Sequence, residues 1–409
     1  MTETTPVDPE SIQIGQRARM IRQRRGLSQE VAAGLAGITK GYLSMLETGK
    51  RGFQRRGMIE DLAAALGCAV ADLTGQPYAA MDRATAEALA VIAEIIPVLY
   101  EDSIPDLPAR PVDQLVNWAS AANAHCDEAR FELAGRQLGA LLTELQIHAA
   151  TGTPATRHAA LTALVEACVV AFGIARQLGH PQLAVQAMRR GQAAAAQLSD
   201  PALAGFTGLA LAGAFSRLGA RSTATTVLHQ TRAIVEPDAD PTGPDVRAAE
   251  ALGMTHLLTA QLASRGGRHG EAQTHLSEAA DLAQRTGERN TLAWHFGPAN
   301  VATWSLGMSI EQGNGTAHAE RLDADLPRHT SAGRRSRLHL DLARGYAQAE
   351  GARDTEAIRH LDTADRIAPT RIRNDPIARS LASELSARVR RRSWELDSLR
   401  NRFGLASVR

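Results

Sequence analysis

A compact group of basic and hydrogen-bonding side chains lies between residues 11 and 60. This segment holds ten Lys and Arg against three Glu, which gives +7, whereas residues 1–10 and 61–409 each sum to −3 and the chain to +1. Such a density of cations in a short segment is typical of a surface that binds a polyanion. The Gln, Ser, Thr and Tyr side chains among them can hydrogen-bond to base edges. The chemistry expected here is therefore recognition of nucleic acid.

About five short helices must position these side chains. The apolar pattern places the helices between Ile12 and Leu73. Ser28 and Thr39 are suitable N-caps for the second and third helices, because a hydroxyl oxygen accepts a bond from a free backbone N–H. Gly37 between them permits a sharp turn.

The window Gln29–Thr48, QEVAAGLAGITKGYLSMLET, resembles the lambda-repressor-like helix-turn-helix family, often called XRE. That family has a small residue at the position of Ala33, where two helices touch, and glycine at the position of Gly37. Its aliphatic positions correspond to Ile38, Leu43 and Leu46. With its matching flanks the resemblance covers about 60 residues, and it implies that the third helix enters the major groove.

The resemblance and the outward positions together give the expected DNA contacts. Lys40, Tyr42 and Ser44 offer hydrogen bonds to bases, although Tyr42 is equally suited to pack against the second helix. Gly41 has no side chain for a base, and it is expected to let the backbone approach the DNA. The full expected set is Gln29, Thr39, Lys40, Gly41, Tyr42, Ser44, Met45, Lys50, Arg51, Arg55 and Arg56.

These contacts divide into two kinds. The third helix would contact bases, with Met45 against a thymine methyl, whereas the loop from Lys50 to Arg56 would bind phosphates without sequence preference. Gln29 stands where the family contacts phosphate or the outermost base. Arg22 and Glu47 match a structural ion pair of the family, which would join the first and third helices.

Helices fill the rest of the chain, where Ala and Leu dominate and Gly, Pro or Asp-Pro separate the apolar segments. The predicted helices are 83–100, 111–125, 127–150, 155–178, 181–198, 201–218, 221–235, 244–265, 269–286, 298–312, 315–326, 332–349, 353–367, 374–391 and 393–403.

Four of these helices share a pattern of small, large apolar and small residues at offsets 0, +4 and +7, which places the three on one helix face. The sets are Ala184, Met188 and Gly191; Ala224, Leu228 and Thr231; Ala272, Leu276 and Ala279; and Ala357, Leu361 and Ala364. The pattern resembles tetratricopeptide (TPR) repeats, although the Trp-Leu-Gly-Tyr signature of their first helix is absent. We therefore expect an all-α fold, a five-helix lambda-repressor-like domain followed by a TPR-like α-solenoid.

The expected organisation is a disordered tail at 1–11, the helix-turn-helix domain at 12–76, a linker with a helix at 77–110, and a TPR-like domain for ligand sensing and dimerisation at 111–409. The chain as a whole is similar to XRE-type regulators with C-terminal TPR domains. That resemblance implies a homodimer on a double-stranded DNA operator and a peptide or small-molecule effector bound by the array. The alternative is a TPR scaffold for a partner protein, tethered to DNA by its N-terminal domain.

One segment is a candidate sensor site. Trp294, Phe296 and Trp304 lie within eleven residues of a chain that is poor in aromatics. Aromatic walls with a few polar anchors are typical of ligand pockets. The expected ligand-binding residues are Trp294, His295, Phe296, Asn300 and Trp304. The alternative is that these aromatics fill a kinked core between repeats.

Other classes of function receive no support from the sequence. It has no G-x-S-x-G, Walker A or H-E-x-x-H pattern, so we expect no enzyme activity and no cofactor. His125, Cys126 and His148 are more typical of structural residues than of a metal site, and no metal is expected. No signal peptide is visible, and charged residues or glycine interrupt the longest apolar runs, which predicts a cytoplasmic protein without a membrane partner.

Overall fold

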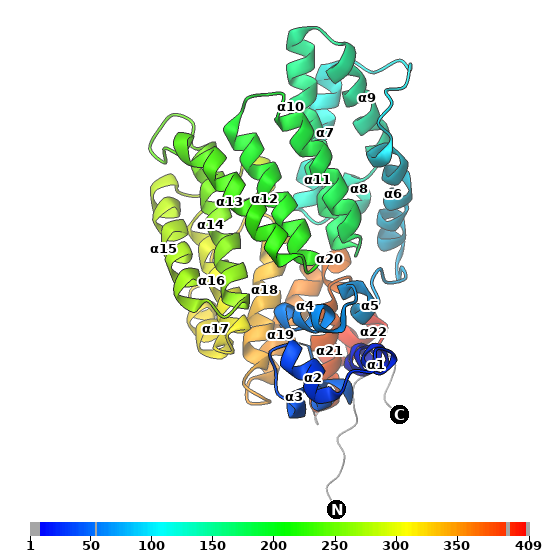
Figure 1. The fold of residues 1–409 in the computed structure, drawn as a ribbon, viewed down its shortest axis with the longest axis vertical. Coiled ribbons are helices and arrows are strands. Elements are labelled where there is room, and N and C mark those ends of the chain that lie inside the picture. Colours follow the sequence, from blue (N-terminus) through cyan, green and yellow to red (C-terminus); the bar gives the residue numbers. More distant parts are fainter. Residues whose placement is uncertain (1–8, 54, 390–392, 406–409) are drawn as a thin grey trace, which may run out of the picture. The chain divides into compact units, whose positions relative to one another are not determined.

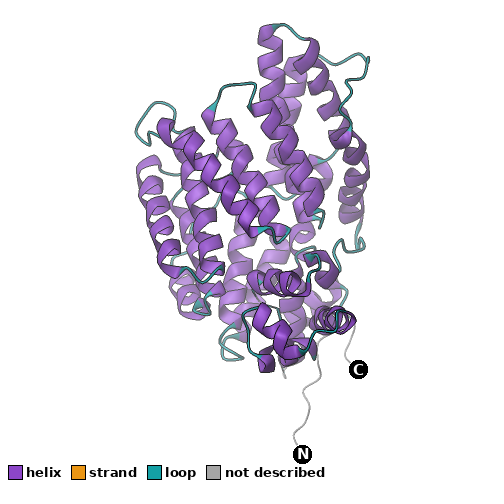
Figure 2. Ribbon diagram, viewed as in Figure 1, coloured by secondary structure: helices purple, strands orange, loops and turns teal. Residues whose placement is uncertain are grey.

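The computed structural model describes residues 9–53, 55–389 and 393–405. Every regular element in these ranges is a helix, as Figure 2 shows. The expected all-α class is thereby confirmed. It follows from a sequence rich in Ala and Leu, which favour helices, and poor in the aromatic residues that favour strands.

The chain divides into two compact units. The first contains residues 1–78, 217–219 and 305–409, and the second contains residues 79–216 and 220–304. This division differs from the expected one. Residues 79–110, expected to form a linker, belong to the second unit, because helix α6 (Arg83–Tyr100) packs on neighbouring helices there. Residues 305–409, expected to lie in one domain with 111–304, belong with the N-terminal helices.

Five short helices form the N-terminal part of the first unit. They are α1 (Pro9–Arg24), α2 (Gln29–Leu35), α3 (Lys40–Glu47), α4 (Arg56–Leu66) and α5 (Val70–Thr74) (Figure 1). Ser28 and Thr39 cap α2 and α3 as expected, with hydroxyl oxygens that accept from the N–H groups of Val31 and Tyr42. Gly37 has φ +68° at the turn. Because α1 begins at Pro9, the expected tail does not extend to residue 11; residues 1–8 lie outside the described part.

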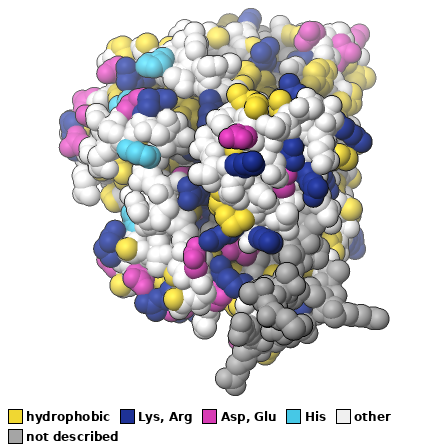
Figure 3. Space-filling view, turned by 60° about the horizontal axis from the view of Figure 1, so that its bottom comes forward, with side chains coloured by type: hydrophobic (Ala, Val, Ile, Leu, Met, Phe, Trp, Pro, Cys, Tyr) yellow, Lys and Arg dark blue, Asp and Glu magenta, His cyan; other side chains and the backbone are white. Residues whose placement is uncertain are grey.

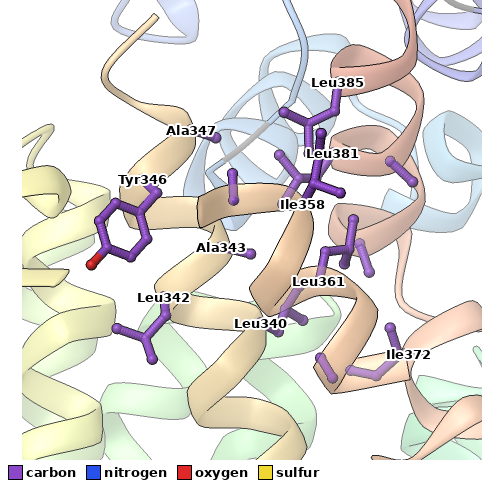
Figure 4. Packing of buried hydrophobic residues seen from close by; sticks show 14 of the residues in the cluster. Leu340, Leu342, Ala343, Tyr346, Ala347, Ile358, Leu361, Ile372, Leu381 and Leu385 are labelled. Atoms are coloured by element: carbon purple, nitrogen blue, oxygen red, sulfur yellow. The ribbon is translucent and has the colours of Figure 1, made fainter. Parts of the chain in front are cut away.

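The C-terminal part of the first unit consists of packed helices with a continuous apolar core. They are α17 (Gly315–Ala324), α18 (Ala332–Ala347), α19 (Asp354–Ile367), α20 (Pro369–Arg373), α21 (Pro376–Arg388) and α22 (Trp394–Phe403). Helix α16 (Pro298–Glu311) begins in the second unit and ends in the first. Figure 4 shows Leu342 and Tyr346 of α18, Leu361 of α19 and Leu381 of α21 in this core.

The second unit is a series of helical hairpins. Its helices are α6, α7 (Val112–Asp127), α8 (Phe131–Ala134), α9 (Leu138–Thr151), α10 (Pro154–Gln177), α11 (Pro181–Ala195), α12 (Pro201–Arg217), α13 (Arg221–Val235), α14 (Arg247–Arg265) and α15 (His269–Thr286), with short 3₁₀ turns η1 (Glu236–Asp238) and η2 (Thr291–Ala293). Phe206, Leu228 and Met254 are part of one core cluster that joins successive hairpins.

The repeat pattern marks the faces that pack. All twelve patterned residues of α11, α13, α15 and α19 are buried except Leu276, which is half-buried. The turns before these helices contain Gly179, Gly219, Gly267 and Gly351, each with positive φ. Small residues are required on these faces: a Cβ on Gly208 of α12 would lie 2.3 Å from Thr231 Oγ1 of α13.

One predicted helix is wrong. The segment 127–150 is not continuous, because α7 runs on to Asp127 and two helices, α8 and α9, follow. Ala129 and Gln137 have φ of 56° and 55°, which no α-helix contains. Close packing adds to the break, since a Cβ on Gly135 would lie 2.3 Å from Val91 of α6. The other predicted helices lie within a few residues of their observed bounds, and α20 was not predicted separately.

Helix α10 is long and apolar enough to cross a membrane by length and composition, and 72% of its most apolar window is buried inside the protein. It packs against α7, α9 and α11, as expected for a core helix. On the face drawn in Figure 3, acidic and basic side chains are interspersed.

Candidate nucleic-acid interface and sensor segment

The exposed side of α3 carries side chains expected to contact base edges. Thr39, Lys40 and Gly41 are exposed at its start. The Lys40 side chain is 62% exposed, with its Nζ 3.9 Å from a Glu30 carboxylate oxygen. Half-buried on the same helix are Tyr42, Ser44 and Met45. The sequence-predicted residues of this helix therefore lie together at the surface of the domain.

An apolar core and a buried ion pair hold α3 in place. Leu43 and Leu46 are fully buried. Arg22 of α1 pairs with Glu47 of α3 through Nε–Oε1 at 2.5 Å and Nη2–Oε2 at 2.9 Å, which confirms the expected structural pair. Gln29 Nε2 donates to the same carboxylate at 2.8 Å. The Gln29 amide, expected at a phosphate or base, therefore joins α2 to α3 in this structure.

Tyr42 has a packing role within the domain, whereas Gly41 has no neighbour there. Tyr42 packs against the core of the N-terminal helices, as the packing alternative expected. A Cβ on Gly41 would meet nothing within 4 Å. The fold therefore gives no steric reason for glycine at position 41, and close approach of a binding partner stays a prediction.

The cations of the basic loop after α3 differ in exposure and in their contacts. Lys50 is exposed and Arg55 is half-buried. Arg51 is exposed, and its Nη1 lies 2.8 Å from Glu350 Oε1 in the turn after α18. An exposed pair of this kind contributes at most about 1 kcal/mol, so a phosphate can compete for Arg51.

Arg56 differs from the expectation. It is buried rather than exposed, and its Nη2 lies 3.0 Å from Asp375 Oδ2 at the start of α21. Burial alone would raise the pKa of Asp375, but the positive charges of Arg56, Arg217 and Arg337 bring it to about 2. Asp375 is therefore an anion at neutral pH, and Arg56 serves as its counter-charge instead of a phosphate ligand in this conformation.

The N-terminal helices dock on the C-terminal helices of the first unit through further contacts. Glu311 of α16 accepts from the backbone N–H groups of Arg56 and Gly57, each at 3.3 Å, at the N-terminus of α4. Phe53 is fully buried, and its N–H donates to Ser380 Oγ at 3.2 Å. Ile377 of α21 belongs to the core of the N-terminal helices.

Sequence reasoning missed this docking surface. Asp375 precedes Pro376 and accepts from the N–H groups of Ile377 and Ala378, so its sequence context predicts only an N-cap. The signal that was available is Phe53, an aromatic inside a basic loop. A large apolar residue in that setting predicts burial against another element.

The candidate sensor segment has a strained backbone. Leu292, Ala293 and His295 have φ of 50°, 61° and 52°. Such conformations cost of the order of 1 kcal/mol or more for residues other than glycine, and they cluster at functional sites. Burial raises the pKa of Glu250, although Thr291 bonds its carboxylate through both N–H and hydroxyl. The segment is thus held in one conformation by its neighbours.

The aromatic and charged side chains of this segment contact distant helices of the second unit. The ring of Trp294 lies 6.5 Å from Phe172 of α10 and 6.4 Å from Phe206 of α12, both nearly parallel. His295 Nε2 lies 2.7 Å from a carboxylate oxygen of Asp127, the last residue of α7. The segment therefore joins α7, α10 and α12.

The five expected ligand-binding residues do not share one surface. Phe296 and Asn300 are buried in the core; a Cβ on Gly253 would lie 2.0 Å from the Phe296 ring. His295 is also buried, whereas Trp294 and Trp304 are half-buried. Phe296 and Asn300 therefore fill the core, as the alternative interpretation of the sequence expected. Trp294 and Trp304 have the exposure that a ligand contact requires.

In the described residues, no group of three or more His, Cys, Asp or Glu side chains is placed to hold a metal ion. All three cysteines are free thiols, and burial raises the pKa of Cys168 to about 12. A thiol with so high a pKa is a poor nucleophile and a poor metal ligand.

Comparison with known proteins identifies the N-terminal part. Residues 13–74 match the family described as a helix-turn-helix domain. No curated protein matches the chain. It is similar to the structure of Bacillus thuringiensis PlcR in complex with the peptide PapR7 and DNA, at 11% identity over 88% of this chain and 96% of that one, with a TM-score of 0.31. The structure of ComR from Streptococcus suis is similar at 13% identity over 69% of this chain and 91% of that one, with a TM-score of 0.25. The match of residues 13–74 shows a helix-turn-helix domain before the helical repeats.

Proposed function

We propose that the chain is a sequence-specific DNA-binding transcriptional regulator, that it acts as a cytoplasmic homodimer, and that its helical repeats sense a peptide or small-molecule signal. The proposal includes no catalytic step and no cofactor. One observation carries it: α3 of the helix-turn-helix domain exposes Thr39, Lys40 and Gly41 while Leu43 and Leu46 are buried behind them. A helix fixed in this way can enter the major groove as a rigid element.

The docking of the helix-turn-helix domain supports a regulated form of this activity. Arg51 and Arg56 are cations of the basic loop, and Glu350 and Asp375 of the repeats neutralise them in this structure. DNA phosphates can compete with Glu350 for the exposed Arg51, whereas the buried Arg56 becomes available to a phosphate only when it separates from Asp375. A signal that shifts α18 or α21 would therefore change DNA affinity, because coupling requires a difference in contacts between two states.

The strained segment around Trp294 supports a sensing role for the repeats. Strain of this kind is a store of energy that a ligand can release or reinforce. Trp294 and Trp304 are the half-buried aromatics that such a ligand would contact. The effector expected at these two rings is a peptide with an apolar side chain, or a small molecule with an apolar group.

Selection of bound duplexes from a random library by the full chain tests the central activity. We expect enrichment of a defined sequence. The double variant Lys40→Ala and Ser44→Ala should lose that enrichment while its helical content and melting temperature stay unchanged, since both side chains point away from the core.

The matched control is Lys50→Ala. Removal of one phosphate contact should weaken binding to all duplexes alike and should lower the slope of log K against log salt by about 1. If the Lys40/Ser44 variant enriches the same sequence as the original chain, α3 does not recognise the DNA and the proposal fails.

A further inference from the structure

The outer face of α6 is an unusual surface for the first helix of a helical array. Its exposed apolar residues are Ala86, Ala90, Ala93, Ile96, Pro97 and Tyr100, with Leu89 half-buried beside them; the charged Arg83, Glu87 and Glu94 of the same helix are also exposed. The apolar residues recur every three or four positions, so they form one apolar stripe along the helix. Ile96 is 42% exposed and Tyr100 58% exposed.

Exposed apolar side chains are concentrated on α6 and on the segments just before and after it. Of the eleven large apolar side chains exposed in the described residues, five lie between residues 81 and 107. Besides Ile96 and Tyr100 they are Met81, Ile104 and Leu107. Single exposed apolar residues are ordinary on protein surfaces, whereas a contiguous group marks an interaction site.

The opposite face of α6 fixes the stripe in place. Ile92, Ile95 and Leu99 are buried, and the helix packs on α8, α9 and α11. The Leu99 carbonyl accepts from Gln186 Nε2 and Arg190 Nε, both at 2.8 Å. The stripe is therefore a rigid surface and not a loose segment.

An end helix of a repeat array normally carries a polar outer face, because the array must stop there. No helix of the second unit precedes α6 in the described chain. An apolar outer face at this position is typical of a surface that another molecule covers.

We propose that the stripe is the dimer interface and that its occupant is α6 of a second copy, packed antiparallel about a two-fold axis beside Ala93. The inference rests on the proposed function for the requirement of two copies on one operator. Residue sizes along the helix favour this arrangement. The N-terminal half has the small Ala86 and Ala90, and the C-terminal half has the large Ile96 and Tyr100.

Antiparallel pairing places each large residue over a small one. Tyr100 of one copy covers Ala86 of the other, Ile96 covers Ala90, and the two Ala93 residues meet at the axis, where small side chains allow close approach. A parallel pair would instead place Tyr100 on Tyr100 and leave a gap between the alanines, which costs packing energy.

Charges at the two ends of α6 agree with the same orientation. Arg83 at the N-terminal end is 92% exposed on its side chain. Glu101 and Asp102 follow the C-terminal end; Asp102 lies 3.0 Å from Arg190 Nη2, and its side chain is still 98% exposed. The antiparallel pair brings Arg83 of one copy to the acidic end of the other, whereas the parallel pair sets like charges together.

Sedimentation equilibrium of the full chain tests the interface. We expect twice the chain mass of 43.6 kDa for the original protein and a single chain mass for Ala93→Arg. The matched control is Ile234→Arg, which charges an exposed apolar residue of α13 outside the stripe and should stay dimeric. A monomeric original protein, or an Ala93→Arg variant that remains dimeric, would overturn the inference.

Disulfide crosslinking tests the orientation. Ala93→Cys should crosslink to itself under mild oxidation, and Ala86→Cys should crosslink to Tyr100→Cys in a mixed sample but not to itself. Self-crosslinking of Ala86→Cys, without the mixed product, would contradict the antiparallel pair.

Binding to a duplex with one half-site separates the two proposals. Ala93→Arg should bind it as the original chain does, because α3 is untouched. A monomeric original protein that recognises its sequence would overturn the interface and the homodimer but leave DNA recognition by α3. A dimer without sequence-specific binding would leave the interface and overturn the DNA-binding function.

Discussion

The Glu47 carboxylate determines the position of α3 at the scale of single residues. It accepts two bonds from Arg22 and one from Gln29, so α1, α2 and α3 meet at one buried anion. Removal of one partner from a buried ion pair leaves an uncompensated charge, which costs far more than loss of a surface pair. The geometry of the DNA-contacting helix therefore depends on this pair although it faces away from the DNA.

Arg22→Ala should lower the free energy of unfolding of the helix-turn-helix domain by about 3–5 kcal/mol. Glu30→Ala, which removes the exposed carboxylate 3.9 Å from Lys40 Nζ, should change stability by less than about 1 kcal/mol. Native-state hydrogen exchange of the α3 amides measures both. Equal effects of the two substitutions would contradict the structural role of the buried pair.

Gly41→Ala separates folding from binding at one residue. The new methyl group meets no neighbour in the chain, and alanine stabilises a helix by about 1 kcal/mol relative to glycine. We expect a higher melting temperature together with weaker DNA binding, because the methyl group would stand between backbone and duplex. Gly34→Ala on α2, also without a neighbour within 4 Å, is the control that should stabilise without loss of binding. Unchanged affinity of Gly41→Ala would remove the close-approach argument.

Packing of helix hairpins can be tested at glycines of the second unit. A Cβ on Gly253 of α14 would meet the Phe296 ring at 2.0 Å, whereas on Gly213 of α12 its nearest neighbour would be Leu258 at 4.0 Å. Gly253→Ala should therefore destabilise by about 1–3 kcal/mol, and Gly213→Ala should be neutral or stabilising. Urea unfolding followed by circular dichroism compares them, and equal midpoints would contradict the described packing of Phe296.

Two helical hairpins hold a pair of facing histidines. His256 of α14 and His275 of α15 approach to 2.8 Å between Nδ1 atoms, and His339 of α18 and His360 of α19 approach to 2.9 Å. Burial, together with the charge of the neighbouring histidine, lowers the pKa of His256 and of His339 to about 4.

Stability should therefore fall as the pH drops from about 6.5 toward 4. The unfolded chain binds the proton near the ordinary pKa of 6.5, whereas the folded chain binds it only near 4, so protonation favours the unfolded state in this window. Melting temperatures at pH 7.5 and 5.0 measure the loss. The double variant His256→Gln and His339→Gln should lose less on acidification; an identical loss would show that other groups cause it.

Single helices and their ends were predictable from the sequence, because the residues that cap, turn or pack a helix lie within or beside it. Ser28, Thr39 and Gly37 mark the ends of α2 and α3 by capping and turn chemistry, and the small-large-small pattern marks the packed faces of four repeat helices. The break between α8 and α9 was not predictable, because it depends on Gly135 against Val91, a contact between helices far apart in sequence.

At the scale of the molecule, local sequence patterns do not reveal which distant helices meet. The association of residues 305–409 with the N-terminal helices rests on Phe53, Arg56 and Asp375, which no spacing rule connects. For the same reason Arg56 was expected at the DNA. The same holds for the candidate sensor residues. Their residue types are visible in the sequence, but the burial of Phe296 and Asn300 depends on packing against distant helices.

Release of the docked domain should strengthen DNA binding. Glu350→Gln removes the carboxylate that holds Arg51, and because the pair is exposed, the fold should be unaffected. We expect a gain in affinity of up to several-fold, the equivalent of about 1 kcal/mol or less, measured by anisotropy with the selected duplex. Glu356→Gln, at a half-buried acid of α19 that pairs with the exposed Arg353, is the control without effect.

A salt titration with footprinting on the selected duplex tests the central claim most directly. We expect the full chain to protect two half-sites about one helical turn apart, with an affinity that falls steeply as salt rises because phosphate contacts release counterions. Association that is insensitive to salt, or the absence of any protected sequence at low salt, would contradict the assignment of α3 as a DNA-recognition helix.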